Sequence, residues 1–416
     1  MLVLQALAKP LRSSLVSLNR AFGVSMTIPY GRQEITAADI KAVVEVLQSD
    51  YLTQGPMVPV FERTIGEYCG VATATAVNSA TSALHLACMA LGVGPGDLVW
   101  TSPITFVASA NCARYCGADV DFVDIDAKTY NMSAERLAEK LEVAKKSGRL
   151  PKVVIPVHLA GQSCDMKTIG ELAKQYGFKV IEDASHAIGA KYLGEPVGNC
   201  RYSDITVFSF HPVKIVTSGE GGVAVTNDAH LGGLMARLRS HGVTRDAAQL
   251  TKPSDGLWYY EQLELGFNYR MTDIYAALGA SQMSRVDEYV ERRQQLAHQY
   301  DLLFANKPIK TPWQHPDTYS SFHLYIIRPD FKAMKTNQRE VFERLRANGV
   351  LANLHYIPVY RQPYYAAMGF DARNFPEAEK YYSEAISLPM YPLLTDAQQI
   401  EVVQKLMTPL GHQTIF

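Results

Sequence analysis

Ser209-Phe210-His211-Pro212-Val213-Lys214, followed closely by Thr217-Ser218-Gly219-Glu220-Gly221-Gly222, is the most informative stretch of the chain. The runs 204–208 and 222–226 on either side have the pattern of two core strands. One lysine therefore lies in a loop rich in Ser, Thr and Gly between two strands. Such a loop can hold an amine still and partly desolvated, so that the amine is neutral and able to form a Schiff base. The alternative is a solvated surface lysine, and the flanking strands and glycines argue against it.

Length and composition are those of an ordinary globular protein. The chain has 416 residues, of which 47% are hydrophobic and 19% are charged, and this length favours two lobes over one core. A net charge of -1 gives no electrostatic reason to expect nucleic acid or an anionic membrane as a partner. No apolar run approaches the roughly 20 residues that span a bilayer. Six scattered cysteines favour reduced thiols in the cytoplasm over disulfides or a metal site.

Strand and helix patterns alternate between residues 73 and 226. The expected strands are 73–77, 98–101, 120–123, 153–157, 179–183, 204–208 and 222–226, and the expected helices are 81–91, 105–116, 134–145 and 166–176. This alternation predicts an α/β fold with a mostly parallel sheet that helices cover on both faces. In such a sheet, ligand-binding residues gather beyond the carboxyl ends of the strands.

The pattern changes towards the C-terminus. A long helix over 281–304 is expected to bridge to a second lobe, in which strands over 322–327 and 350–354 mix with a helix over 339–348. We therefore predict a large domain over 27–280 and a smaller α+β domain over 281–416. Residues 1–26 contain basic but no acidic side chains, so this extension could be a targeting peptide, a misplaced start or a disordered segment.

Asn78-Ser79-Ala80-Thr81-Ser82 joins an expected strand to an expected helix. Free backbone N–H groups at a helix start, together with Ser and Thr hydroxyls, form an anion site. Thr81 and Ser82 are therefore our candidates for binding a phosphate. A simple helix N-cap explains this motif equally well when it is taken alone.

Glu182-Asp183-Ala184-Ser185-His186 ends another expected strand. Side chains alternate along a strand, so Glu182 and Asp183 should face opposite sides of the sheet. A buried Asp183 would be costly without a cationic partner. Taken alone, His186 would be interpreted as a core histidine. Asp183 and Lys214, each beside a strand end, together make a site far more plausible than either residue does alone.

These motifs resemble the DegT/DnrJ/EryC1 family of sugar aminotransferases. Those enzymes carry pyridoxal phosphate (PLP) on the lysine of a Ser-Phe-His-x-x-Lys sequence that is followed by Glu-Gly-Gly. The resemblance extends from about Ile28 to the end of the chain. It implies a PLP fold type I large domain, like that of aspartate aminotransferase, with Lys214 as the catalytic residue. The resemblance is strongest to the branch that aminates a UDP-linked 4-keto sugar on the way to pseudaminic acid.

The resemblance also assigns cofactor-binding roles. Asp183 matches the carboxylate beneath the pyridine nitrogen, which keeps that nitrogen protonated so that the ring can accept electrons. Phe106 matches the residue that stacks on the ring, although alone it would be interpreted as a core residue, and His186 matches the residue near the ring hydroxyl. Asn268, in a Gly-x-Asn-x-Arg motif, matches a residue that reaches the phosphate in the neighbouring subunit, so we expect a homodimer with shared active sites. The implied cofactor residues are Thr81, Ser82, Phe106, Asp183, His186, Ser209, Lys214 and Asn268.

The substrate residues are implied in the same way. The segment 52–55 borders the nucleotide-sugar pocket in the family, and Arg270 is a candidate for gripping the substrate. Both Asn268 and Arg270 could instead be turn residues, and the aromatic cluster after 354 could be ordinary packing. The implied set is Tyr30, Leu52, Thr53, Gln54, Gly55, Ser82, Ser209, Arg270, His355, Tyr356, Ile357, Pro358 and Tyr365. No metal site is expected.

The predicted activity moves an amino group from L-glutamate to a nucleotide-linked 4-keto-6-deoxy sugar, with UDP-4-keto-6-deoxy-N-acetyl-altrosamine as the first candidate. One alternative is amination at C3 or C4 of a dTDP- or GDP-linked keto sugar. A second is the dehydratase-type branch of the family, which has a histidine in place of the lysine, so Lys214 argues against it. A third is a PLP-binding regulator without turnover. Such a protein has often lost a catalytic residue, whereas this chain has Lys214, Asp183 and the phosphate motif.

Overall fold

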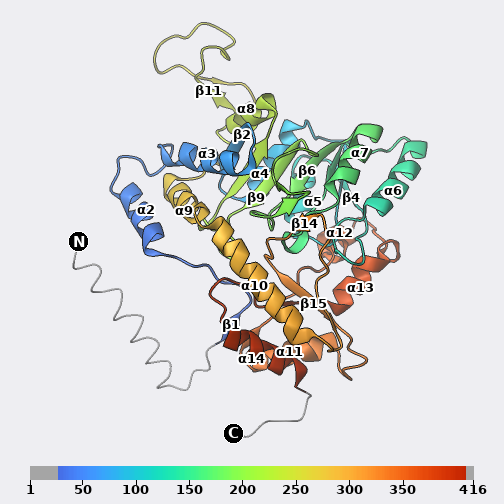
Figure 1. Cartoon of the computed structure of the whole chain (residues 1–416). Helices are drawn as coiled ribbons and strands as arrows, with labels where there is room; N and C mark the ends of the chain where they lie inside the picture. Colours follow the sequence, from blue (N-terminus) through green and yellow to red (C-terminus); the bar gives the residue numbers. More distant parts are fainter. Residues whose placement is uncertain (1–26, 409–416) are drawn as a thin grey trace, which may run out of the picture.

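The computed structural model describes residues 27–408, and the prediction for residues 1–26 lies outside this range. The chain is built on a seven-stranded sheet with the order β2-β10-β9-β6-β5-β3-β4 (Figure 1). Only β10 is antiparallel to its neighbours, and all other adjacent pairs are parallel. The strands are β2 (Thr73–Val77), β3 (Leu98–Thr101), β4 (Asp119–Phe122), β5 (Val153–Ile155), β6 (Lys179–Asp183), β9 (Ile205–Ser209) and β10 (Gly222–Thr226). The predicted α/β fold with a mostly parallel sheet is confirmed.

Helices cover both faces of this sheet because its side chains are apolar on both. Val99, Ile155 and Val207 pack under the helices of one face, whereas Trp100 and Phe208, each one residue along, pack on the opposite face. The first face is covered by α4 (Ala80–Ala90), α5 (Ala108–Tyr115) and α8 (Ala229–Leu238). The second is covered by α3 (Met57–Cys69), α6 (Ala134–Ser147), α7 (Met166–Tyr176) and α9 (Asp273–Met283).

A second core forms around the C-terminal half of α10 (Val286–Phe304), which runs diagonally away from the large sheet in Figure 1. Its elements are β13 (Ile309–Lys310), β15 (Tyr325–Pro329), α11 (Gln338–Ala347), β16 (Val350–Leu351), β17 (Ile386–Leu388) and α14 (Asp396–Met407). A separate apolar cluster joins α13 (Pro376–Glu384) to β4 and to the other side of β15. The first strand, β1 (Ile28–Pro29), pairs with β16, so the start of the described chain belongs to this part. The remaining elements are α2 (Ala37–Leu47), β7 (Lys191–Tyr192), β8 (Glu195–Pro196), β11 (Val243–Thr244), β12 (Glu261–Gln262), β14 (Thr318–Tyr319) and α12 (Pro363–Ala366).

Several expected elements are shorter in the structure, such as the strand expected over 350–354, which is β16 (Val350–Leu351), and two others differ in a way that side chains explain. The helix expected over 281–304 is divided, because α9 ends at Met283 and α10 begins at Val286. The intervening Arg285 turns its guanidinium to both carboxylate oxygens of the buried Asp39, at 2.9 and 2.8 Å. The strand expected from residue 322 begins only at Tyr325, because Phe322 has a positive φ of 43°.

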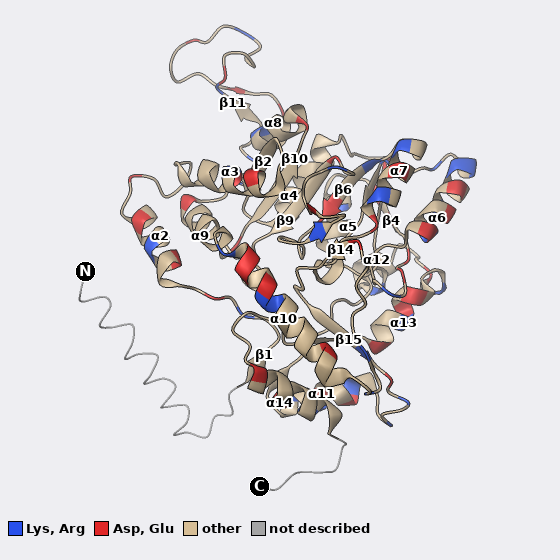
Figure 2. Cartoon of the chain, viewed as in Figure 1, with Lys and Arg blue, Asp and Glu red and all other residues tan. Residues whose placement is uncertain are grey.

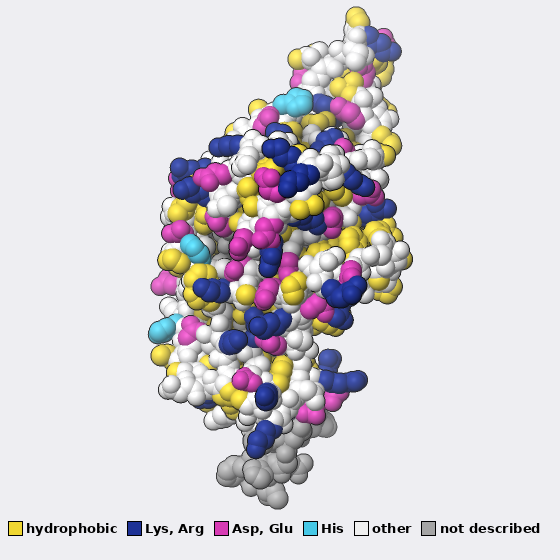
Figure 3. All heavy atoms as spheres, turned by 90° about the vertical axis from the view of Figure 1, so that its right-hand side faces the viewer, with side chains coloured by type: hydrophobic (Ala, Val, Ile, Leu, Met, Phe, Trp, Pro, Cys, Tyr) yellow, Lys and Arg dark blue, Asp and Glu magenta, His cyan; other side chains and the backbone are white. Residues whose placement is uncertain are grey.

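Charged side chains of both signs are interspersed over the surface. Both signs occur along α6 and α10 in Figure 2, and the face in Figure 3 carries them side by side with scattered apolar groups. A single-sign patch that would attract nucleic acid is not visible on these faces. Over the described residues, every helix is too short or too polar to cross a membrane.

Candidate active site

A cavity of about 450 Å³ opens where β2, β6 and β9 end. This volume is in the usual range for a cofactor or small-molecule site. The parallel arrangement brings these strand ends together, as the position of the motifs predicted. Nine residues predicted for cofactor or substrate line the cavity: Tyr30, Thr81, Phe106, Asp183, His186, Ser209, Lys214, His355 and Tyr356.

Lys214 lies in a tight loop between β9 and β10. Its backbone N–H donates to the His211 carbonyl at 2.9 Å, and the N–H of Phe210 donates to the Gly221 carbonyl at 2.9 Å, which closes the base of the loop. The side chain is half-buried and faces the cavity. Burial lowers the pKa of its amine to about 8, and the charge of Asp183 offsets part of that shift. The amine can therefore act as a nucleophile and as a base near neutral pH.

Asp183 stands at the end of β6 and is only 4% exposed. Its Oδ2 accepts a hydrogen bond from the Ser109 hydroxyl at 2.6 Å, and its Oδ1 accepts one from the Ser185 hydroxyl at 2.6 Å. Glu182 points to the other face, where it accepts a hydrogen bond from His158 at 2.7 Å. The two carboxylates thus face opposite ways, and only Asp183 lines the cavity, where it can pair with a cation.

The start of α4 forms an open anion cradle. Ser79 caps the helix by accepting the N–H of Ser82 at 3.2 Å, whereas the N–H groups of Ala80 and Thr81 have no hydrogen-bond partner among residues 27–408. Free N–H groups at a helix start fit a phosphate. A Cβ at Gly222 would lie 2.4 Å from the Ala80 nitrogen. A glycine is therefore required here, so that β10 and this cradle can pack together.

His186 and Tyr356 form the wall beyond Asp183. The N–H of Ala160 donates to His186 Nδ1 at 3.2 Å, so this nitrogen is unprotonated, and Nε2 lies 3.1 Å from the Tyr356 hydroxyl. Burial, and then the charge of Lys214, lower the pKa of His186 well below its usual range. Phe106 is 59% exposed at the cavity edge, with its ring centroid 6.2 Å from that of Tyr356. The core interpretation of Phe106 is therefore wrong.

Other predicted site residues lie outside the cavity lining of this single chain. The Ser82 hydroxyl donates to Asn78, and Tyr365 is buried with its hydroxyl donating to Asn111 at 2.6 Å. Asn268 is exposed and pairs through its backbone with Ser240. The others in this group are Leu52, Thr53, Gln54, Gly55, Arg270, Ile357 and Pro358. The backbone of Thr53 pairs with that of Thr272. The segment 52–55 therefore lies near the segment that contains Asn268 and Arg270.

Sequence reasoning missed several residues of the cavity wall. Ser185 and Glu220 stand within the quoted motifs and Thr105 directly precedes Phe106, so their positions were a usable signal. His323 also lines the cavity, but it comes from the loop before β15 and no local pattern marks it. Ser109, which holds Asp183, lies one helical turn beyond Thr105 and could have been found from the start of α5.

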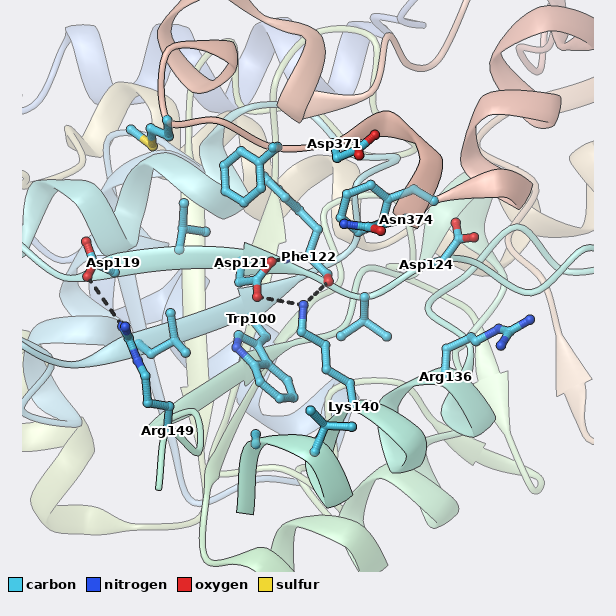
Figure 4. A pocket seen from close by; sticks show the side chains of 18 of the residues that line it. Trp100, Asp119, Asp121, Phe122, Asp124, Arg136, Lys140, Arg149, Asp371 and Asn374 are labelled. Atoms are coloured by element: carbon cyan, nitrogen blue, oxygen red, sulfur yellow. Dashed lines mark hydrogen bonds and ion pairs between the residues drawn. The ribbon is translucent and has the colours of Figure 1, made fainter. Parts of the chain in front are cut away.

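A larger hollow, of about 1010 Å³, lies over the edge strand β4 (Figure 4). Its charged groups bind one another: Lys140 pairs with Asp121 at 2.7 Å and donates to the Phe122 carbonyl at 2.5 Å. This lysine thereby covers part of the free edge of the sheet. None of the predicted site residues lines this hollow, so we place the active site at the smaller cavity.

Comparison with known proteins shows the family to which the chain belongs. Residues 33–407 match the DegT/DnrJ/EryC1/StrS aminotransferase family, and the chain belongs to it. The chain is 37% identical over 367 residues to the UDP-4-amino-4,6-dideoxy-N-acetyl-beta-L-altrosamine transaminase of Campylobacter jejuni, covering 88% of this chain and 92% of the relative. It is 35% identical over 367 residues to GDP-perosamine synthase of Caulobacter vibrioides, covering 88% and 93%.

The structure is similar to that of Helicobacter pylori PseC, an aminotransferase involved in the biosynthesis of pseudoaminic acid. The TM-score is 0.82 at 32% identity, and the match covers 92% of this chain and 98% of the other. The protein is therefore a PLP-dependent sugar aminotransferase of nucleotide-sugar metabolism.

The lowered pKa of Lys214 predicts how its amine reacts in cofactor-free protein. Modification by an amine-directed reagent, followed by peptide mass spectrometry, should rise through a midpoint near pH 8, because the amine is protonated and unreactive below that pH. Asp183→Asn removes the charge that favours the protonated form, so the midpoint should fall by roughly one pH unit or less. Glu182→Gln, on the opposite face of β6, should leave it unchanged. A midpoint that Asp183→Asn does not move would contradict this electrostatic coupling.

Proposed function

We propose that this aminotransferase uses L-glutamate to aminate UDP-4-keto-6-deoxy-N-acetyl-altrosamine at C4, a step of pseudaminic acid biosynthesis. The observation that carries the transamination is the shared cavity of Lys214, Asp183 and the α4 start. The similarity to the Campylobacter enzyme and to PseC supports the sugar. L-glutamate as the donor follows from family resemblance. The absence of disulfides among the described cysteines is compatible with the cytoplasmic location that we expect.

Each residue of the cavity has a distinct proposed task. PLP, when bound, supplies an electron sink for the broken C–H bond. Lys214 would hold the cofactor through its amine, and the free amine would take the proton from Cα of L-glutamate and later give a proton to C4 of the sugar. Asp183, oriented by Ser109 and Ser185, pairs with the pyridine nitrogen. Ala80 and Thr81 offer their free N–H groups to the phosphate.

The remaining wall suits a sugar and orients it. Tyr30, His355 and Tyr356 lie together, with the rings of Tyr30 and His355 5.3 Å apart. Burial, and then the charge of Lys214, lower the pKa of His355 to about 3, so it stays neutral. Because the imidazole rings of His186 and His355 stay neutral, Lys214 is the group of this wall that can take up and release a proton near neutral pH. A rival substrate, a dTDP- or GDP-linked keto sugar, would meet the same wall, and the 35% identity to GDP-perosamine synthase keeps it as the second candidate.

A homodimer with shared active sites is the second part of this proposal. The outer face of α2 exposes Ile40, Val44 and Leu47, which recur at the spacing of one helix face and are 58%, 40% and 55% exposed. An apolar stripe of this kind is typical of a surface that a partner covers. Asn268 lies outside the cavity of its own chain and is free to reach that of a second copy.

Visible absorption tests the substrate, because pyridoxal and pyridoxamine forms of the cofactor absorb differently. PLP-loaded protein should lose its pyridoxal band with L-glutamate. After glutamate is removed, the band should return on addition of the UDP-linked 4-keto sugar and not with dTDP- or GDP-linked keto sugars. If glutamate removes the pyridoxal band and only a dTDP- or GDP-linked keto sugar restores it, that sugar replaces the UDP-linked sugar as the proposed substrate. No conversion by glutamate would reject the donor, and failure with any amino donor would favour a non-catalytic regulator.

Mixing two inactive variants tests the shared site. Lys214→Ala and Asn268→Ala should each have little activity as pure dimers. If Asn268 serves the partner's site, a mixed dimer combines both defects in one site and leaves the other site intact. Random exchange of subunits should then restore about a quarter of the wild-type activity. A mixture as inactive as its components would mean that each site takes Lys214 and Asn268 from the same chain.

A further inference from the structure

His323 is a buried histidine that the proposed mechanism does not yet use. It is 4% exposed and lines the cavity together with Lys214 and His186. Its Nδ1 is fully buried without a hydrogen-bond partner, whereas Nε2 is not among the fully buried unpaired atoms of residues 27–408. Buried polar atoms in folded proteins almost always have partners, because leaving one unpaired is destabilising. Nδ1 is closed off from the cavity, so Nε2, which is neither closed off in this way nor paired within residues 27–408, is the nitrogen that a molecule in the cavity can reach.

The backbone around His323 is held firmly in position. The buried Arg293 donates from Nη1 to the carbonyls of Phe322 at 3.1 Å and His323 at 3.2 Å. On the other side, the Ser321 hydroxyl donates to the carbonyl of His186 at 2.9 Å. Phe322 adopts a φ of +43°, which a phenylalanine rarely does. Such strain persists only where the surroundings impose it, and it is common at ligand sites.

The ring of His323 packs against His186. The two ring centroids are 4.4 Å apart with an interplanar angle of 47°. Both nitrogens of His186 are already engaged, by Ala160 and Tyr356. His323 therefore contacts the face of His186 and does not share a hydrogen bond with it.

Both rings remain neutral in this environment. Burial, and then the positive charges of the nearby Lys214 and Arg293, hold the pKa of His323 well below its usual range. A neutral imidazole can donate from one nitrogen and accept at the other. His323 can therefore bond to an oxygen without adding a charge beside Lys214.

We propose that His323 is a positioning residue of this site, which braces the face of His186 and presents a ring nitrogen to an oxygen of the bound molecule. The proposal rests on the proposed function, since the bound molecule is the cofactor or the keto sugar. Both carry hydroxyl or carbonyl oxygens that a neutral imidazole can bind. The loop before β15 thereby connects the C-terminal part of the chain to the reacting groups.

Two near-isosteric variants separate a polar role from a packing role. His323→Asn keeps a hydrogen-bonding side chain, whereas His323→Leu does not. If the oxygen belongs to the cofactor, His323→Leu should bind PLP about tenfold more weakly than wild type, as for one lost hydrogen bond, and His323→Asn should stay within about threefold. PLP dissociation constants and the pH dependence of visible absorbance measure this directly. Unfolding temperatures report any general loss of structure.

The matched control is the same pair of changes at His85, which is buried on α4, lies 3.2 Å from the Tyr269 hydroxyl and does not line the cavity. His85→Asn and His85→Leu should bind PLP equally well. If the two His323 variants bind PLP alike but only His323→Leu needs more keto sugar for half-maximal turnover, the oxygen belongs to the sugar.

Equal behaviour of His323→Asn and His323→Leu in both assays would overturn the polar role. A wild-type protein that shows no visible PLP band would reject the Lys214 assignment and this proposal together. A wild-type band combined with equal His323 variants would reject this proposal alone.

Discussion

Lys214 and Asp183 impose the constraint on which this site depends. Burial favours the neutral amine, whereas the nearby carboxylate favours the protonated amine, and the balance leaves the pKa of Lys214 at about 8. Neither effect alone would suit the reaction: an exposed lysine would stay protonated, and a buried lysine without a carboxylate would lose its proton too readily for acid catalysis. The balance requires the ends of β6 and β9 to be neighbours, and the parallel pairing of Asp183 with Val207 provides this.

The glycines after Lys214 extend the same constraint to the anion cradle. Gly222 begins β10, and its Cα lies so close to Ser79 and Ala80 that a side chain would collide with their backbone. The lysine loop, the antiparallel strand β10 and the start of α4 therefore form one packed unit. The antiparallel direction of β10 follows from the short loop that joins it to β9, because a parallel neighbour would need a longer crossover connection. The packed unit holds the Lys214 amine and the anion cradle of α4, the two ends of the proposed cofactor site, at a fixed distance from each other.

Much of this arrangement could be predicted from the sequence, because local signals mark it. Lys214, Asp183 and Thr81 each follow a recognisable strand, and the ends of parallel strands meet at one edge. Contacts between distant segments could not be predicted in this way. Ser82 donates its hydroxyl to Asn78, Tyr365 turns into the core, and His323 arrives from a loop more than a hundred residues beyond Lys214. The break between α9 and α10 depends likewise on Arg285 reaching Asp39, which no helical pattern reveals.

The central claim is that Lys214 is the amine that carries the cofactor. Borohydride reduction of the PLP-loaded protein makes the attachment permanent, and peptide mass spectrometry then locates it. The account predicts a phosphopyridoxyl group on the peptide that contains Lys214 and on no other lysine. Attachment to a different lysine, or no attachment to a protein that binds PLP, would contradict it.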